Sequence, residues 1–196
     1  MKRTVVLAFV LVGFLVSVHA QEQDDLFGGL HRKGSQMISL STGGGIPLFI
    51  LPTDASATEP YPLGVGASFS LSYDYFLANR FALGGSLTGA FNTTVGGRTL
   101  FLAPLALRLG YWWGRSPVEF RAGTDLGFCI MRLSGNGVIT PFAKAGAGAF
   151  VQVSEAWSVG GQTYWWFIPE LHTGSYASLN RFANILEISI GALYHF

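Results

Sequence analysis

Charged residues are scarce in this chain. They make up 12% of its 196 residues, whereas hydrophobic residues make up 49%, so the charge content is about half that of an ordinary soluble domain. Twelve basic residues nearly balance eleven acidic ones, which leaves no basic surface for nucleic acid. Cysteine occurs once, at Cys129, so no disulfide can form within the chain. The composition favours a membrane protein or a poorly soluble all-β protein.

Long apolar runs are also missing, except at the N-terminus. There Lys2 and Arg3 precede an apolar segment, Val5 to Val16, and Val18-His19-Ala20 places small residues before a cleavage point. This arrangement is typical of a secretory signal peptide. The alternative, an uncleaved anchor helix, disagrees with the length of the run, which falls short of the roughly 20 residues that a membrane span needs.

We therefore expect three parts: a signal peptide over residues 1–20, a periplasmic N-terminal extension over 21–34 and one domain over 35–196. No later stretch is apolar for eighteen residues, which argues against transmembrane helices in that domain.

Strict alternation of apolar residues with small or polar ones takes the place of long apolar runs. It is clearest from Val65 to Tyr75, and it recurs over 36–45, 81–92, 103–113, 118–130, 143–153, 157–167 and 186–196. A period of two predicts β-strands. Eight strands joined by alternately short and mostly longer connections predict an all-β fold, an eight-stranded antiparallel transmembrane β-barrel.

The two faces of these strands differ sharply in side-chain size. An eight-stranded barrel has room inside for little more than small filling side chains, and the large apolar residues share one parity. A soluble, lipocalin-like barrel would turn this apolar face inward. Its outer surface would then consist mostly of small residues with few charges, which water solvates poorly. We therefore expect the apolar face to contact lipid. Aromatic residues of that face gather beside the short turns, as at a membrane interface: Tyr75, Phe81, Tyr111, Trp113, Trp157, Tyr194 and Phe196.

With these features the chain resembles the small outer-membrane β-barrel proteins, the group that includes OmpX-type and OmpW-type proteins and the barrel domain of OmpA. The signal peptide, the eight alternating strands and the ending Tyr194-His195-Phe196 carry the resemblance. It implies a location in the bacterial outer membrane, with membrane lipids as partners. It also implies that Tyr194 and Phe196 form the signal read by the barrel-assembly machinery. It assigns no subfamily.

Charged residues within the predicted strands all fall on the inward parity. We predict that they form a luminal charge network: Asp74, Arg108, Glu119, Arg121, Asp125, Lys144 and Glu187. A hairpin that pairs Met131 with Val138 would set Asp125 opposite Lys144, with Arg108 on its other side. Four acids against three bases favour a compensated core that ties the strands together. The alternative is an ion-selective constriction.

Inward positions near the longer connections are apolar, where a water-filled pore would carry polar groups. They predict an apolar vestibule: Leu100, Leu102, Met131, Phe142, Trp166 and Ile168. Similarity in character to the OmpW-type lumen implies passage of small apolar compounds, although simple packing in a narrow barrel is an alternative. The predicted function is a small channel or conduit for small, hydrophobic solutes. The alternative function is a pore-less surface barrel whose loops bind host or environmental ligands.

Catalysis and metal binding have little support in the sequence. His31, His172 and His195 lie on separate segments without metal-ligand spacing. Some barrels of this group modify lipid A, but the His-x-Ser spacing of their deacylase type is absent. Gly43-Gly44-Gly45 is not followed by Gly-Lys-Ser/Thr, so it is no phosphate loop. We expect no catalytic residues, no metal site and no cofactor.

Overall fold

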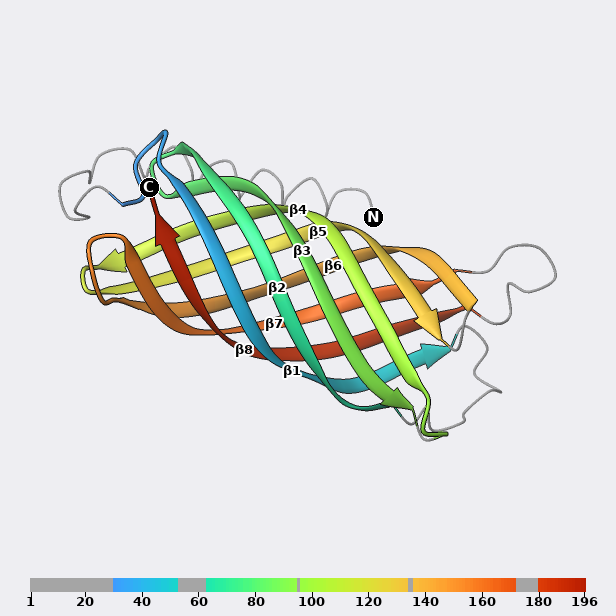
Figure 1. Ribbon diagram of the computed structural model, residues 1–196. Coiled ribbons are helices and arrows are strands. Elements are labelled where there is room, and N and C mark those ends of the chain that lie inside the picture. The colour runs from blue at the N-terminus through green and yellow to red at the C-terminus, as the bar shows by residue number, and fades with distance from the viewer. Residues whose placement is uncertain (1–29, 53–62, 95, 134–135, 172–179) are drawn as a thin grey trace, which may run out of the picture.

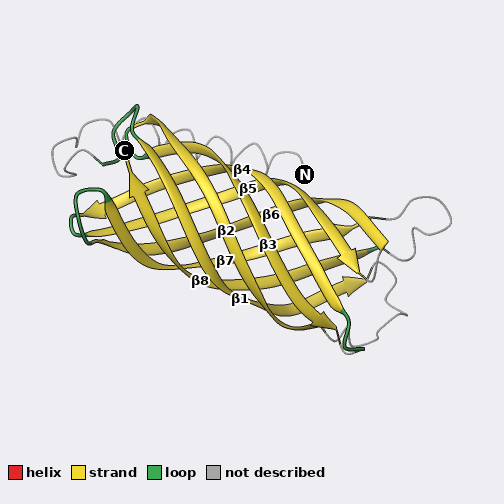
Figure 2. Cartoon of the chain, in the orientation of Figure 1, coloured by secondary structure: helices red, strands yellow, loops and turns green. Residues whose placement is uncertain are grey.

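The computed structural model describes residues 30–52, 63–94, 96–133, 136–171 and 180–196, and within them it forms a closed antiparallel barrel (Figures 1 and 2). Each strand pairs with its neighbours in sequence, and β8 pairs with β1. The predicted fold class is therefore confirmed. The strands are β1 (Gln36–Pro52), β2 (Leu63–Ala78), β3 (Phe81–Thr94), β4 (Thr99–Arg115), β5 (Val118–Leu133), β6 (Asn136–Gln152), β7 (Trp157–Glu170) and β8 (Arg181–His195).

The signal peptide predicted over residues 1–20 lies outside the described residues, as does most of the predicted extension. Among the residues that are described, no helix is long and apolar enough to cross a membrane.

The two ends of the barrel differ in their connections. Tight turns at 79–80, 116–117 and 153–156 lie at the end where the chain finishes, here called the short-turn end (Figure 1). Strands β1, β3, β5 and β7 finish at the other end, where β2, β4, β6 and β8 begin, and this end is here called the loop end. Gly114 shows why one turn needs glycine, because its φ is 131° and a Cβ there would lie 2.5 Å from the Val118 carbonyl oxygen.

Burial alternates along the strands as the sequence predicts. Large apolar side chains cover the outside, and Leu107 and Ile190 are each 69% exposed. The seven charged residues predicted to face inward are all buried. The other charged residues of the described strands, Arg115, Arg132, Glu170 and Arg181, lie at or near strand ends. An apolar exterior around a polar core is suited to lipid and not to water.

Aromatic rings of the outer face meet beside the short turns. The rings of Trp157 and Tyr194 have centroids 5.0 Å apart, and those of Tyr194 and Phe196 are 5.8 Å apart. Tyr111 and Trp113 stack at 6.0 Å. This placement matches the interfacial belt expected from the sequence.

Strand β1 is longer than its sequence pattern indicates. Alternation predicts a strand over 36–45 and a loop from about Pro47, but β1 continues to Pro52. Its register against β8 shifts between Pro47 and Phe49. A bulge inserts a residue and reverses the parity of all positions after it. The period of two therefore disappears from the sequence although the strand continues.

Candidate functional site

A cavity of about 280 Å³ opens at the loop end of the lumen. Leu100, Leu102, Met131 and Ile168 line it, so four of the six residues predicted for the vestibule meet in one space. Most other lining residues are also aliphatic, among them Ile50, Leu63, Leu133, Val138 and Ile185. Polar groups come from Thr94, Arg98, Glu170 and Arg181, which lie at strand ends or in a connection.

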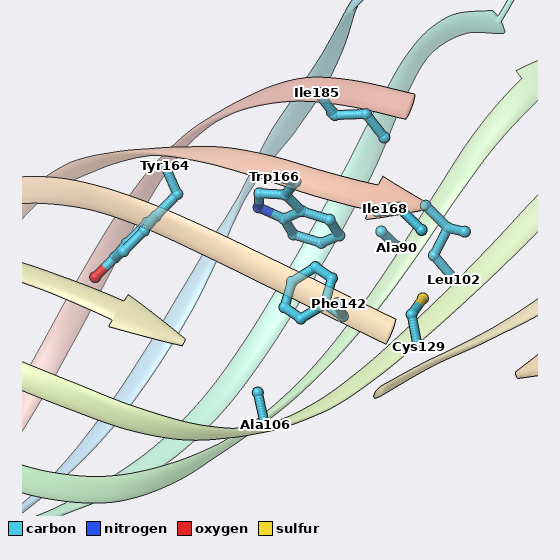
Figure 3. Close-up of a cluster of buried hydrophobic side chains, with 9 residues drawn as sticks. All are labelled: Ala90, Leu102, Ala106, Cys129, Phe142, Tyr164, Trp166, Ile168 and Ile185. Carbon is cyan, nitrogen blue, oxygen red and sulfur yellow. The ribbon is translucent and has the colours of Figure 1, made fainter. Parts of the chain in front are cut away.

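Phe142 and Trp166, the other two predicted residues, do not line this cavity but pack into the buried cluster drawn in Figure 3. Their rings meet edge to face, with centroids 5.3 Å apart and an interplanar angle of 87°. Both are nearly buried, at 3% and 2% exposure. Parity places a side chain inside the barrel but does not fix its depth. The two rings therefore form the floor of the vestibule instead of its wall.

Two ladders of the barrel wall stop short of the loop end beside the cavity. The β1–β2 ladder ends at Gly45 opposite Gly66, and a second unpaired seam lies between β6 and β7. Their ladder ends at Ala143 opposite Phe167, although β6 extends back to Asn136 and β7 onward to Glu170. Pro141 and Pro169 lie in this unpaired stretch and supply no N–H group for a ladder. The hydroxyl of Thr140 donates a hydrogen bond to the Pro169 carbonyl and ties the two strands there.

A belt of charged residues fills the lumen below the floor, with Asp125 at its centre. Arg108 Nε lies 3.0 Å from Asp125 Oδ1, and Lys144 Nζ lies 3.5 Å from Asp125 Oδ2. The register sets Arg108 and Lys144 on either side of Asp125, as predicted. Ser86 donates to the same carboxylate at 2.8 Å.

Two further carboxylates complete this charge belt. Glu187 Oε2 lies 3.8 Å from Lys144 Nζ and accepts a 2.7 Å hydrogen bond from Trp166 Nε1, which joins the belt to the vestibule floor. Asp74 Oδ2 lies 4.0 Å from Arg108 Nη1. The charges of this belt are paired across the lumen. Their role as a compensated core instead of a constriction stays a prediction.

The predicted network of seven charges divides into two groups, because Glu119 and Arg121 lie near the short-turn end. Glu119 Oε2 is 3.1 Å from His31 Nε2, and the Arg121 guanidinium lies over the Trp112 ring at 5.5 Å. Sequence reasoning missed His31, which it assigned to a periplasmic extension. His31 precedes β1 in an irregular turn, where no period marks an inward side chain.

His195 joins the same end, with its ring 5.6 Å from that of His31. The third candidate histidine, His172, lies outside the described residues. Within those that are described, no group of three or more His, Cys, Asp or Glu side chains could hold a metal ion. Tyr194 and Phe196 point outward at the end of β8, and their role as an assembly signal stays a prediction.

Comparisons with known proteins agree with this architecture. A protein-family model matches residues 19–194, and the chain belongs to the family that this model defines. Neisserial surface protein A superposes with a TM-score of 0.63 at 14% identity, over 84% of this chain and 98% of that one. OprG from Pseudomonas aeruginosa gives a TM-score of 0.57 at 10% identity, over 85% and 97%.

The chain therefore has the fold of the small eight-stranded outer-membrane β-barrels, and the resemblance in fold stated from the sequence is confirmed. In sequence it is similar to an uncharacterized protein of Treponema pallidum (strain Nichols). The two are 27% identical over 184 residues, which cover 84% of this chain and 78% of that protein.

Proposed function

We propose that this barrel is a conduit for small apolar molecules, which enter a vestibule at the outward-facing loop end and leave through the barrel wall into the membrane. The observation that carries the proposal is the apolar cavity of about 280 Å³ at the loop end. A mostly apolar cleft with a few polar groups at its edge is the usual form of a small-molecule site.

Burial of apolar surface supplies the affinity. A small alkyl or aromatic molecule gains about 25 cal/mol for each Å² of apolar surface removed from water, and part of that gain offsets lost translational freedom. Leu100, Leu102, Met131 and Ile168 offer aliphatic contact but little hydrogen bonding. Polar solutes would lose their hydration in such a space without compensation.

The seam between β6 and β7 supports an exit through the wall. A straight path along the lumen would cross the charge belt, where an apolar molecule must separate Asp125 from Arg108 and Lys144 at a cost of several kcal/mol. The seam lacks ladder pairs beyond Ala143 and Phe167. Val138 and Ile168 line the cavity and belong to this stretch, so the vestibule lies beside the seam.

Trp166 provides a probe of binding from the vestibule floor. With Trp112, Trp113, Trp157 and Trp165 replaced by Phe, titration with 1-octanol or naphthalene is expected to change Trp166 fluorescence in a saturable way. Met131→Arg places a charge in the cavity and should abolish the change, whereas the matched variant Met131→Leu should retain it. Both variants should still migrate differently before and after boiling, as a closed barrel does. A response that persists in Met131→Arg, or none in the parent protein, would contradict the proposal.

A further inference from the structure

The six residues before β1 fold over the short-turn end of the barrel. In this turn, Leu30–Ser35, the Ser35 hydroxyl donates to the carbonyls of Leu30 and Arg32, at 3.0 and 2.6 Å. The Gly34 N–H donates to the Phe76 carbonyl at 2.8 Å. The Arg80 N–H donates to the His31 carbonyl, also at 2.8 Å. The turn is thus fastened to β2 and to the β2–β3 turn.

The fastened turn directs His31 into the lumen, where only 4% of the residue is exposed. Its ring stacks on Phe76 of β2 and Trp112 of β4, with centroid distances of 5.1 and 4.8 Å. Its edge meets His195 of β8, and its Nε2 lies beside Glu119 of β5. One side chain therefore contacts four strands around the barrel end.

The balance of buried charges also favours a position of His31 inside the barrel. The strands bury four carboxylates but only three cations, and the Arg121 guanidinium lies over Trp112. His31 is the group paired with Glu119. An imidazole that is protonated carries a positive charge, which favours the ionised carboxylate beside it. Removing His31 would leave the Glu119 carboxylate buried without this partner, which is strongly unfavourable.

We propose that Leu30–Ser35 is a luminal plug, which closes the short-turn end of the barrel by holding the His31 ring among Phe76, Trp112, Glu119 and His195. A solute in the lumen then has no exit at that end. The plug is independent of the proposed function, because it would close the barrel whether or not the vestibule binds a ligand.

Quenching of Trp112 by acrylamide tests the plug, in a protein whose other four tryptophans are replaced by Phe. The quenching constant should be low in this parent and rise several-fold in His31→Ala. His31→Phe should stay nearer the parent, because it keeps the stacking. Imidazole added to His31→Ala should restore protection, whereas sodium chloride at equal concentration should not. Equal quenching constants in the parent and His31→Ala would overturn the proposal.

A second measurement keeps the plug testable if His31→Ala fails to fold. In a Cys129→Ala background that keeps His31, Ser158→Cys is compared with Lys33→Cys. Ser158 is buried at the same end, 3.1 Å from His195 Nε2, whereas Lys33 is exposed in the turn. A water-soluble maleimide should modify the thiol at position 158 many times more slowly than the thiol at position 33. Equal rates in folded barrels would show that the short-turn end is open to solvent and would refute the plug.

Discussion

The two ends of the lumen are built on the same inward parity yet differ in what fills them. At the short-turn end, Met37, Phe76, Trp112 and Phe150 are fully buried, and His31 stacks against two of their rings. At the loop end, the wall consists mainly of Leu, Ile, Val and Met, and a cavity remains. Side-chain volume therefore decides which end of a narrow barrel is hollow.

The charge belt separates these two ends, and its loss should have the largest effect on stability. Asp125→Ala leaves Arg108 and Lys144 buried without their shared partner, so we expect a loss of about 3–5 kcal/mol in the free energy of unfolding. Denaturant midpoints of the refolded barrel measure it. Glu155→Ala, in the exposed β6–β7 turn, is the control and should cost under about 0.5 kcal/mol. Equal midpoints would mean that water solvates Asp125.

The same truncation made at each end compares their packing directly. Leu193 belongs to the tight short-turn cluster and is 1% exposed, whereas Leu100 lines the cavity. Leu193→Ala should therefore cost about 2–5 kcal/mol, as in well-packed cores. Leu100→Ala enlarges a space that is already hollow and should cost about 1 kcal/mol. If Leu100→Ala lowers the free energy of unfolding as much as Leu193→Ala or more, the two ends do not differ in packing.

A disulfide across the β6–β7 seam should alter transport without altering stability greatly. Continuing the ladder past Ala143 and Phe167 sets position 141 opposite position 169. In a Cys129→Ala background, Pro141→Cys with Pro169→Cys is expected to close the seam when oxidised. Transfer of naphthalene from the vestibule into liposome lipid should then slow, while its affinity stays the same. The reduced protein is the control, and identical transfer rates in both forms would argue against the wall exit.

Much of the fold can be predicted from the sequence because one face of each strand contacts lipid and the other faces the lumen. The side chains of the two faces therefore differ strongly in polarity. Alternation predicts which residues face inward, since a slip of one residue would turn every charge toward lipid. The pairing of Asp125 with Lys144 follows from the hairpin that sets Met131 opposite Val138. The far half of β1 is missed because a bulge near Pro47 reverses the parity. The depth of Phe142 and Trp166 is missed because parity carries no information along the barrel axis.

The plug is missed for a different reason. His31 stands in a turn held by Ser35 and Gly34, and its burial depends on side chains that lie 45 or more positions away, Phe76, Trp112 and Glu119. No local pattern marks such a residue. The sequence indicates this burial only through Glu119, because with this carboxylate the strands carry four inward acidic residues against three basic ones.

The difference between the two ends is tested most directly by one titration on two proteins, each with a single tryptophan. One keeps Trp166 at the vestibule floor, and the other keeps Trp112 beside His31. With naphthalene as the ligand, we expect a saturable fluorescence change at Trp166 and none at Trp112 over the same concentrations. A change of equal size and midpoint at Trp112, or a change at Trp112 alone, would contradict this expectation.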